Sequence, residues 1–254
     1  MHSIDLELVA TDAGEMWFPM CDEVMRDFIR NSGTWEPSVG RALLEAMPSR
    51  AGAVFVDVGA NVGYFSLLVA NAFPLAIVQA FEPHPLTFQV LRMNTWLLGD
   101  RVCAWPVALS DANGTVALST TLHNLGDTKG VPGSSGMRAS TVAPSMRLDD
   151  LIGDMSVDLV KIDVQGAELA VLSGMRGVID RSPGVRIVME FSPGLLQKNG
   201  VDAMAVLSEL RSGGFNLSLV CPDALFAASD AEILRYCQSA GVMGQANLLL
   251  SRTI

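Results

Sequence analysis

The sequence contains no cluster of lysine and arginine side chains. Its 17 basic residues are outnumbered by 27 acidic ones, and the formal net charge is −10 at pH 7. Proteins bind nucleic acid mainly through contacts of basic side chains with phosphates. A chain with this charge is therefore expected to act on a small molecule and not on nucleic acid.

Long apolar runs and paired cysteines are also missing. Hydrophobic residues make up 50% of the chain, yet no uninterrupted apolar run approaches the roughly 18 residues that a membrane-spanning helix needs. Residues 1–8 lack the basic and apolar regions of a signal peptide, so a cytoplasmic location is expected. The four cysteines are scattered without a Cys-x-x-Cys pair, which favours buried reduced thiols over a zinc site or disulfides.

The dinucleotide fingerprint Gly-x-Gly-x-x-Gly is absent, and a different glycine-rich turn ends the first apolar run. This run begins at Ala53, and residues 57–63 read Asp-x-Gly-x-Asn-x-Gly before a helical pattern starts. A strand, a glycine turn and a helix start in succession bring a ligand against backbone N–H groups at the helix N-terminus. The turn predicts a small-molecule site, and its spacing disfavours a nicotinamide cofactor.

Glu82 lies at the end of the next apolar stretch, residues 76–81. A carboxylate at the tip of a second parallel strand can accept two hydrogen bonds from a ribose diol. The alternative is a surface acid beside the turn formed by residues 83–85. Together with the glycine turn, Glu82 predicts a site of the size of a nucleoside.

Strands and helices alternate along most of the chain. Strands are expected near residues 53–58, 76–81, 102–107, 156–162, 184–189, 215–220 and 246–250, with helices between most of them. This alternation predicts one α/β domain over residues 50–254, with a sheet of seven mostly parallel strands and helices on both faces. Residues 1–49 show two helical patterns, at 20–29 and 39–47, and no clear sheet pattern, so we expect an N-terminal helical cap.

The alternation breaks after residue 107. The Asn113-Gly114 pair is a hairpin signal, which predicts that residues 108–111 and 115–120 pair as strands. Residues 123–144 are rich in glycine, serine, threonine and proline, and we expect them to form a long mobile loop over the site.

Acidic residues follow several of the expected strands. The set consists of Asp57, Glu82, Asp111, Asp163 and Glu190. In an open α/β sheet, ligands collect outside the carboxyl ends of the strands. A rim of acids there suits a ligand with a positive centre next to a nucleoside, as in S-adenosylmethionine. For Asp57 and Asp163 the alternative role is that of a helix N-cap.

Several ordered blocks resemble those of a known family. The blocks are residues 57–66 (Asp-Val-Gly-Ala-Asn-Val-Gly-Tyr-Phe-Ser), 81–83 (Phe-Glu-Pro), 108–111 (Ala-Leu-Ser-Asp), 148–150 (Leu-Asp-Asp) and 161–168 (Lys-Ile-Asp-Val-Gln-Gly-Ala-Glu). They are similar to the signature blocks of FkbM-type S-adenosylmethionine-dependent methyltransferases, and the resemblance runs from about residue 35 to 190. It implies a Rossmann-like class I methyltransferase sheet of seven strands, the last antiparallel. It also implies methyl transfer to oxygen on sugars, polyketides, glycolipids or other secondary metabolites.

The resemblance also implies roles for single residues. Gly59, Asn61 and Gly63 would line the methionine and ribose part of the cofactor, after Asp57 at the end of the strand, and Glu82 would bind the ribose hydroxyls. Ser110 and Asp111 would face the adenine edge, Asp163 would lie near the methionine amino group and the transferred methyl, and Glu36 would fold over the cofactor. The sequence departs from the family at Gln165, where a glutamate is usual.

An alcohol acceptor needs a group that takes up its proton. We expect His123 to be this base, because a neutral imidazole with a pKa of about 6.5 accepts a proton near neutral pH. Asp163 would then orient the cofactor and Glu190 the acceptor, while His84 would edge the adenine pocket. A divalent metal ion held by Asp163 and Glu190 is the alternative, which is not favoured because only two oxygen ligands are visible.

Two other function classes remain open. Gln165 suggests a methyltransferase-like protein that binds cofactor without catalysis. An NAD-dependent oxidoreductase would also have a strand, a glycine turn and a ribose-binding acid, but the chain lacks a Tyr-x-x-x-Lys constellation for hydride transfer. The sequence leaves both the acceptor and the oligomeric state open, with a homo-oligomer as one alternative.

Overall fold

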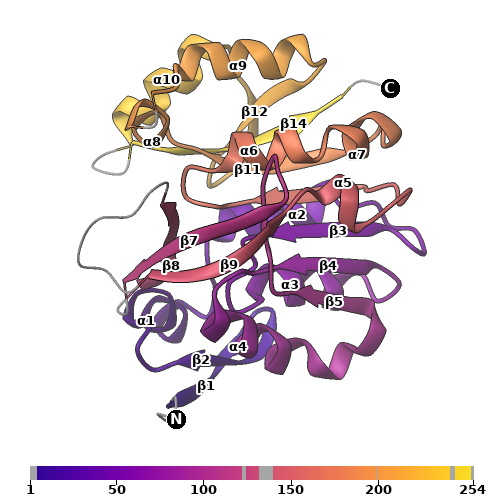
Figure 1. Ribbon diagram of the computed structural model, residues 1–254, viewed down its shortest axis with the longest axis vertical. Coiled ribbons are helices and arrows are strands. Elements are labelled where there is room, and N and C mark those ends of the chain that lie inside the picture. The colour runs from indigo at the N-terminus through magenta and orange to yellow at the C-terminus, as the bar shows by residue number, and fades with distance from the viewer. Residues whose placement is uncertain (1–4, 122–123, 132–139, 199, 241–243, 253–254) are drawn as a thin grey trace.

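An eight-stranded sheet forms the centre of the protein. The structure is a computed structural model that describes residues 5–121, 124–131, 140–198, 200–240 and 244–252. The strands of the sheet follow the order β13-β12-β14-β11-β10-β3-β4-β5 (Figure 1). They are β3 (Val54–Val58), β4 (Ile77–Phe81), β5 (Val102–Trp105), β10 (Leu159–Ile162), β11 (Arg186–Phe191), β12 (Asn216–Val220), β13 (Leu225–Ala227) and β14 (Ala246–Ser251).

All seven expected strands are present in this sheet, but the expected total was one too few. The additional strand is β13, which turns back on β12 through a hydrogen bond from the Cys221 N–H to the Ala224 carbonyl. It has three residues, and Phe226 at its centre is 53% exposed, so it carries no alternation that a sequence pattern could reveal. The last strand, β14, pairs antiparallel with both β11 and β12, as expected for this fold.

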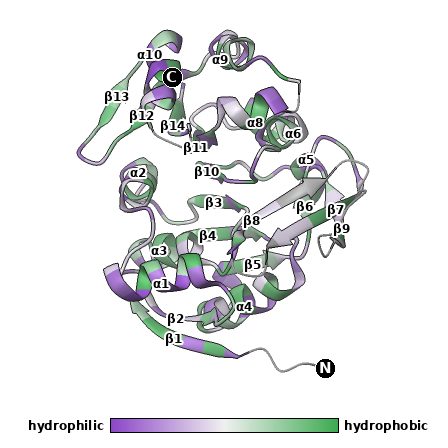
Figure 2. Cartoon of the chain, turned by 90° about the vertical axis from the view of Figure 1, so that its left-hand side faces the viewer, coloured by the Kyte–Doolittle hydropathy of each residue, from purple (hydrophilic) through white to green (hydrophobic). Residues whose placement is uncertain are grey.

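Helices cover both faces of the sheet, so that it forms the middle of three layers (Figure 2). One face carries α2 (Pro37–Ala46), α3 (Tyr64–Ala72) and α4 (Pro85–Thr95), which is followed by the short 3-10 helix at Trp96–Arg101. The other face carries α5 (Leu148–Leu151), α6 (Glu168–Gly174), α7 (Arg176–Arg181), α8 (Pro193–Lys198), α9 (Ala203–Ser212) and α10 (Asp230–Ser239). Successive strand residues feed opposite cores: Phe55 packs in the first, and Val54 and Val56 in the second.

The two expected helices of the N-terminal segment are present, but the segment also contains a β-hairpin that the sequence pattern did not predict. Strands β1 (Leu6–Thr11) and β2 (Gly14–Pro19) pair antiparallel and precede α1 (Glu23–Ser32). Met16 and Phe18 are fully buried, while Trp17 between them is 38% exposed. The alternation of a half-buried strand is therefore present, but an outward-facing tryptophan hides it from a hydropathy pattern.

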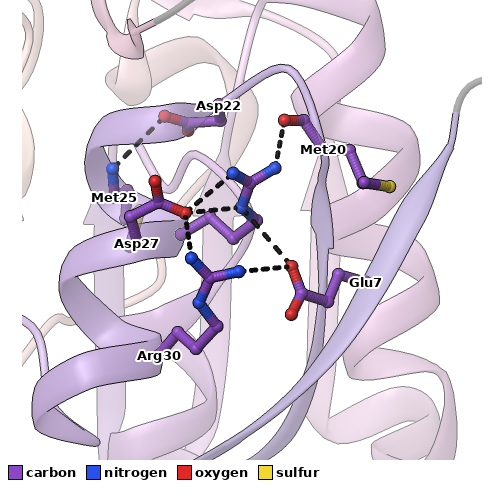
Figure 3. A network of polar contacts seen from close by, with 7 residues as sticks. Glu7, Met20, Asp22, Met25, Asp27 and Arg30 are labelled. Atoms are coloured by element: carbon purple, nitrogen blue, oxygen red, sulfur yellow. Dashed lines mark hydrogen bonds and ion pairs between the residues drawn. The ribbon is translucent and has the colours of Figure 1, made fainter.

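Two arginines of α1 tie this helix to the hairpin (Figure 3). The Arg26 guanidinium lies 2.7 Å from an Asp27 carboxylate oxygen and 3.5 Å from a Glu7 carboxylate oxygen, and it donates to the Met20 carbonyl. Arg30 lies 3.6 Å from the same Glu7 oxygen. Arg26 is only 8% exposed, so its ion pairs are shielded from water more than ordinary surface pairs.

A second sheet follows β5. It contains β6 (Ala108–Leu109), β7 (Gly114–Thr121), β8 (Asn124–Val131) and β9 (Ser140–Met146) in the order β6-β9-β7-β8. The expected pairing of β6 with β7 was wrong, because β9 lies between them. The Asn113 side chain accepts a hydrogen bond from the Arg147 N–H at 2.9 Å and so holds the end of β9 in place.

The long loop expected at 123–144 was also wrong in part. Residues 124–131 and 140–144 belong to strands, since β7 pairs antiparallel with both β8 and β9. The remaining residues, 132–139 and His123, lie outside the described residues. Within the described ranges, no helix is long and apolar enough to cross a membrane.

Candidate active site

The register of β3 against β10 places two buried side chains of opposite charge on one face of the sheet, just below the strand ends. Asp57 and Lys161 are register partners in this parallel pair, so their side chains leave the same face of the sheet. Asp57 is fully buried and Lys161 is 4% exposed. The Ser66 hydroxyl at the start of α3 donates to Asp57 Oδ2 at 2.7 Å. Buried charges need such partners, because an unpaired one is costly.

Lys161 contacts the loop beyond its own strand. Its Nζ lies 3.3 Å from Asp163 Oδ2 and 4.9 Å from the centroid of the Phe65 ring. Desolvation lowers the pKa of Lys161, but the carboxylates of Asp163, Asp57 and Glu36 together raise it above its ordinary value. The ammonium group therefore stays charged. A lysine inside an apolar strand is a sequence signal for buried acidic partners, and Lys161 was not among the expected site residues.

Glu36 and Glu190 approach the same place from α2 and β11. Burial, and then the negative charge of Asp163, raise the pKa of Glu36 to about 7. Burial, and then the carboxylates of Asp163, Glu168 and Glu36, raise the pKa of Glu190 to about 8. Glu190 is 6% exposed, and its Oε2 accepts from Gln245 Nε2 at 2.8 Å. Its Oε1 is buried and has no hydrogen-bond partner among the described residues.

These side chains form one group, the carboxylate cluster. Its members are Glu36, Asp57, Asp163, Glu168 and Glu190, together with Lys161. Glu168 interacts with Asp163 and Glu190, and the other four carboxylates interact with the Lys161 ammonium. Five carboxylates therefore share one ammonium group. Glu168 accepts from the Gly166 N–H at 2.9 Å, and burial raises its pKa. Among the described residues, no set of three or more His, Cys, Asp or Glu side chains is arranged to hold a metal ion.

Gln165 completes the environment of Asp163. Its Nε2 donates to Asp163 Oδ1 at 2.9 Å, so both oxygens of that carboxylate face a donor. A glutamate at position 165 has no amide hydrogen to give, and it would add another negative charge. Gln165 has a φ of 54°, in the left-handed region that side chains rarely adopt. The departure from the family pattern therefore changes the charge of the cluster.

Glu82 joins the glycine turn after β3 to the turn after β4. Its two carboxylate oxygens accept from the N–H groups of Asn61 and His84, each at 2.8 Å. Glu82 is 6% exposed, which excludes the alternative of a surface acid. Burial raises its pKa, although these hydrogen bonds act in the opposite direction. Each carboxylate oxygen has a second lone pair, so the residue retains acceptor capacity for ligand hydroxyls.

Gly59 and Gly63 are required by the packing of the protein itself. A Cβ atom at Gly59 would lie 2.0 Å from the Asp163 carbonyl oxygen, and one at Gly63 would lie 2.6 Å from Leu91 Cδ1. The two N–H groups of Gly59 and Ala60 donate to the Phe81 carbonyl, each at 3.0 Å. These hydrogen bonds hold the end of β3 against the end of β4, and the close approach of Gly59 to the Asp163 carbonyl holds it against the end of β10. A ligand at this edge of the sheet would lie outside these strand ends.

The family model described as the methyltransferase FkbM domain matches residues 57–217, which include the glycine turn, Glu82 and most of the carboxylate cluster. The chain belongs to the FkbM methyltransferase family.

Relatives within and around this family share about 30% of the aligned residues. Methyltransferase sdnD of Sordaria araneosa is 31% identical over 47% of this chain and 59% of its own length. Hexuronic acid methyltransferase AglP of Haloferax volcanii is 30% identical over 69% of each chain. The 31-O-demethyl-FK506 methyltransferase FkbM of Streptomyces tacrolimicus is 28% identical over 76% of this chain and 83% of its own. The chain therefore spans less than two thirds of sdnD.

One solved structure illustrates the fold. A putative rRNA methylase from Clostridium thermocellum superposes with a TM-score of 0.51 at 10% identity, covering 85% of this chain and 96% of that one. At this identity the similarity shows the fold alone. The order and directions of the strands in this FkbM-family chain agree with a Rossmann-like methyltransferase sheet.

Ser110, Asp111, His84 and His123 were also expected at the site of this FkbM-family chain. Ser110 and Asp111 follow β6, where the Ser110 hydroxyl donates to Asp111 at 3.1 Å and the Ser110 backbone packs tightly against Gly174 of α6. His84 is the N-cap residue of α4, its Nδ1 is buried without a partner among the described residues, and burial lowers its pKa. His123 lies outside the described residues, so its role as a base stays a prediction.

We expect Gly59→Ala to destabilise the protein strongly. The variant combines a left-handed φ of 76° with the contact to the Asp163 carbonyl. The φ costs about 1–2 kcal/mol, and overpacking against backbone adds about 1–3 kcal/mol. Gly52→Ala is the matched control, because Gly52 has a φ of 69° and open space at the Cβ position. Urea denaturation should show the larger loss only in Gly59→Ala, and equal losses would contradict the close approach of the two loops.

Proposed function

We propose that the protein transfers the methyl group of S-adenosylmethionine to a hydroxyl group of a small molecule. The observation that carries this proposal is the carboxylate cluster beside Glu82. A nucleoside that carries a positive centre matches both parts, since Glu82 suits ribose hydroxyls and the cluster suits a cation. Membership of the FkbM methyltransferase family supports the same reading.

The residues present fit this cofactor. Glu82 lies at the tip of β4 with acceptor capacity to spare, and Asn61 adopts a φ of 50° that turns the chain before α3. Asp163 has a side chain that is 27% exposed, and Lys161 and Gln165 hold its two oxygens in position. We propose that Asp163 binds the amino group of the methionine part. When bound, the cofactor supplies a methyl group that is activated by the sulfonium.

The acceptor proton needs a base, for which we propose Glu190 as a candidate in addition to His123. A carboxylate whose pKa is raised to about 8 takes up a proton far more readily than an ordinary glutamate. The unpartnered Oε1 of Glu190 leaves one oxygen available for an acceptor hydroxyl. Whether Glu190 or His123 is the base, we also propose that Glu190 orients the acceptor.

The two bases predict different kinetic results. If Glu190 is the base, Glu190→Gln should lower kcat by about 10²–10⁴ with cofactor affinity retained. If His123 is the base, His123→Ala should have that effect and Glu190→Gln should raise KM instead. Single-turnover methyl transfer separates chemistry from binding, and a loss of kcat that EDTA reproduces and Mg²⁺ restores would favour the metal alternative.

For the acceptor we propose a hydroxylated sugar, polyketide or glycolipid. The names of the relatives AglP and FkbM refer to a hexuronic acid and to a 31-O position. We further propose that residues 1–49 cap the acceptor pocket of a methyltransferase domain formed by residues 50–254. Glu36 supports the cap, because it is the residue of this segment that enters the carboxylate cluster.

The first test is binding of S-adenosylmethionine by titration calorimetry. We expect Glu82→Gln to raise its Kd by about 10- to 100-fold, which corresponds to ~1.5–3 kcal/mol for hydrogen bonds to a charged group. Glu209→Gln is the matched control, because the Glu209 side chain is 71% exposed on α9. A thermal melt should confirm that Glu82→Gln stays folded. Absence of binding in the wild-type protein would sink the proposal.

A cofactor-binding protein without catalysis remains the second candidate. Gln165 prompts it, since this position differs from the family pattern beside Asp163. Transfer of a labelled methyl group to any member of a panel of sugars, polyketides and lipids excludes it. Tight cofactor binding with no transfer across the panel, together with no gain in Gln165→Glu, would favour it.

A further inference from the structure

We propose that the carboxylate cluster holds protons that it releases when a cationic ligand binds, and that it thereby discriminates S-adenosylmethionine from the product that lacks the sulfonium charge. The inference rests on the proposed function, because it takes S-adenosylmethionine as the cationic ligand. Loss of the methyl group turns the sulfonium into a neutral thioether, so S-adenosylhomocysteine carries one positive charge less.

The first step is the imbalance of charge. Five carboxylates converge from α2, β3, α6, β11 and the loop after β10, and the ammonium of Lys161 is the cation among them. Lys161 is already engaged, since it lies 3.3 Å from Asp163 and leaves the same face of the sheet as Asp57. An excess of negative charge is costly in a site where three of the carboxylates, Asp57, Glu168 and Glu190, are buried, so some of the carboxyl groups keep their protons near neutral pH.

Glu190 is the first proton carrier of the cluster. Glu190 faces Asp163, Glu168, Glu36 and Lys161, and its one hydrogen bond comes from the neutral Gln245. Its Oε1 is buried and has no partner within the described ranges, which is the arrangement of a carboxyl group that awaits a ligand or keeps a proton.

Glu36 is the second proton carrier. It faces the negative charge of Asp163 and the positive charge of Lys161, and burial opposes its ionisation. The pKa values of about 7 for Glu36 and about 8 for Glu190 leave both groups partly protonated at pH 7.

The next step is the response to a ligand. A positive centre next to the cluster favours the ionised carboxylates and lowers their pKa values, so protons leave as the ligand binds. The product keeps its amino group but has a neutral thioether, so it exerts a weaker pull and releases fewer protons from Glu190 and Glu36. The affinity for S-adenosylmethionine should therefore rise from pH 6 to pH 8 more steeply than the affinity for S-adenosylhomocysteine.

Titration calorimetry of the full-length protein in phosphate and in Tris at pH 7 tests this. The dependence of the observed heat on the ionisation enthalpy of the buffer yields the number of protons released. We expect S-adenosylmethionine to release more protons than S-adenosylhomocysteine, by up to about one. Sinefungin, which carries an ammonium group in place of the sulfonium, should behave as S-adenosylmethionine does.

Variants locate the protons. Glu190→Gln keeps an oxygen that can accept from Gln245, and it should remove most of the proton release. Glu36→Gln should remove a smaller part. Glu209→Gln, on the exposed face of α9, should leave the proton number unchanged, and a thermal melt of each variant shows that the fold is retained.

Each outcome bears on one proposal. Equal proton numbers for S-adenosylmethionine and S-adenosylhomocysteine overturn the discrimination by charge. A proton release that persists in both Glu190→Gln and Glu36→Gln overturns its assignment to the cluster. If S-adenosylmethionine produces no heat and no displacement of a fluorescent analogue, the proposed function itself fails.

Discussion

Lys161→Met should lower the free energy of unfolding by about 3–5 kcal/mol at pH 8, the usual cost of removing one partner of a buried ion pair. Methionine fills a similar volume over the Phe65 ring but leaves Asp57 and Asp163 without their cation. The loss should shrink at pH 5.5, where protons can neutralise the carboxylates in place of the ammonium. Urea denaturation at the two pH values measures both effects.

Two further variants control this experiment. Lys198→Met removes an exposed lysine of α8 and should change stability by less than about 0.5 kcal/mol. Asp163→Asn in the Lys161→Met background removes one unpaired carboxylate and should recover part of the loss. A Lys161→Met protein as stable as the wild type at pH 8 would show that Lys161 does not neutralise the cluster.

Glu190→Gln should have the opposite effect and stabilise the protein at alkaline pH. The pKa of Glu190 is raised from 4.5 to about 8, so the folded chain binds a proton that the unfolded chain releases in that range. Stability from this group is complete below pH 4.5 and falls as the pH rises toward 8. The amide has no proton to lose. We therefore expect a gain of roughly 2–4 kcal/mol at pH 9 and almost none at pH 4.5.

Thermal denaturation across this pH range measures the gain. The difference in Tm between Glu190→Gln and the wild type should grow with pH, whereas the difference for Glu209→Gln should stay flat. A gain that is independent of pH would mean that the substitution improves packing or hydrogen bonding. Such a result would contradict the buried, protonated state of Glu190.

The central sheet could be predicted because its strands are short apolar runs separated by helical patterns. The hairpin was missed because Trp17 faces outward, and β13 because it is a three-residue partner of β12. The second sheet was misjudged for another reason. The insertion of β9 between β6 and β7 pairs Ala108 with Ser145 and Ser119 with Ser140, and no local turn signal encodes a pairing between segments so far apart in the chain.

The place of the site could also be predicted, since strand ends mark it in an α/β sheet. Asp163 and Glu190 meet there, and Glu82 spans the turns after β3 and β4. Lys161 was overlooked as the cation of the cluster, and the charges of Glu36 and Glu190 depend on burial that only the folded chain produces. Hydrogen bonds such as the one from Gln165 to Asp163 depend on a side-chain position that spacing does not encode.

Glu36, Asn61 and Gln165 are the non-glycine residues with positive φ in the described part of the chain, and all three lie on loops around the candidate site. Each left-handed residue costs about 1–2 kcal/mol, which glycine would largely recover. Selection for thermal stability alone would therefore favour glycine at these positions. The resulting protein would be more stable, but it would lack the carboxylate of Glu36 and the hydrogen-bond donor that Gln165 provides to Asp163. Engineering of this enzyme fold for stability should leave these three positions untouched and seek its gains elsewhere.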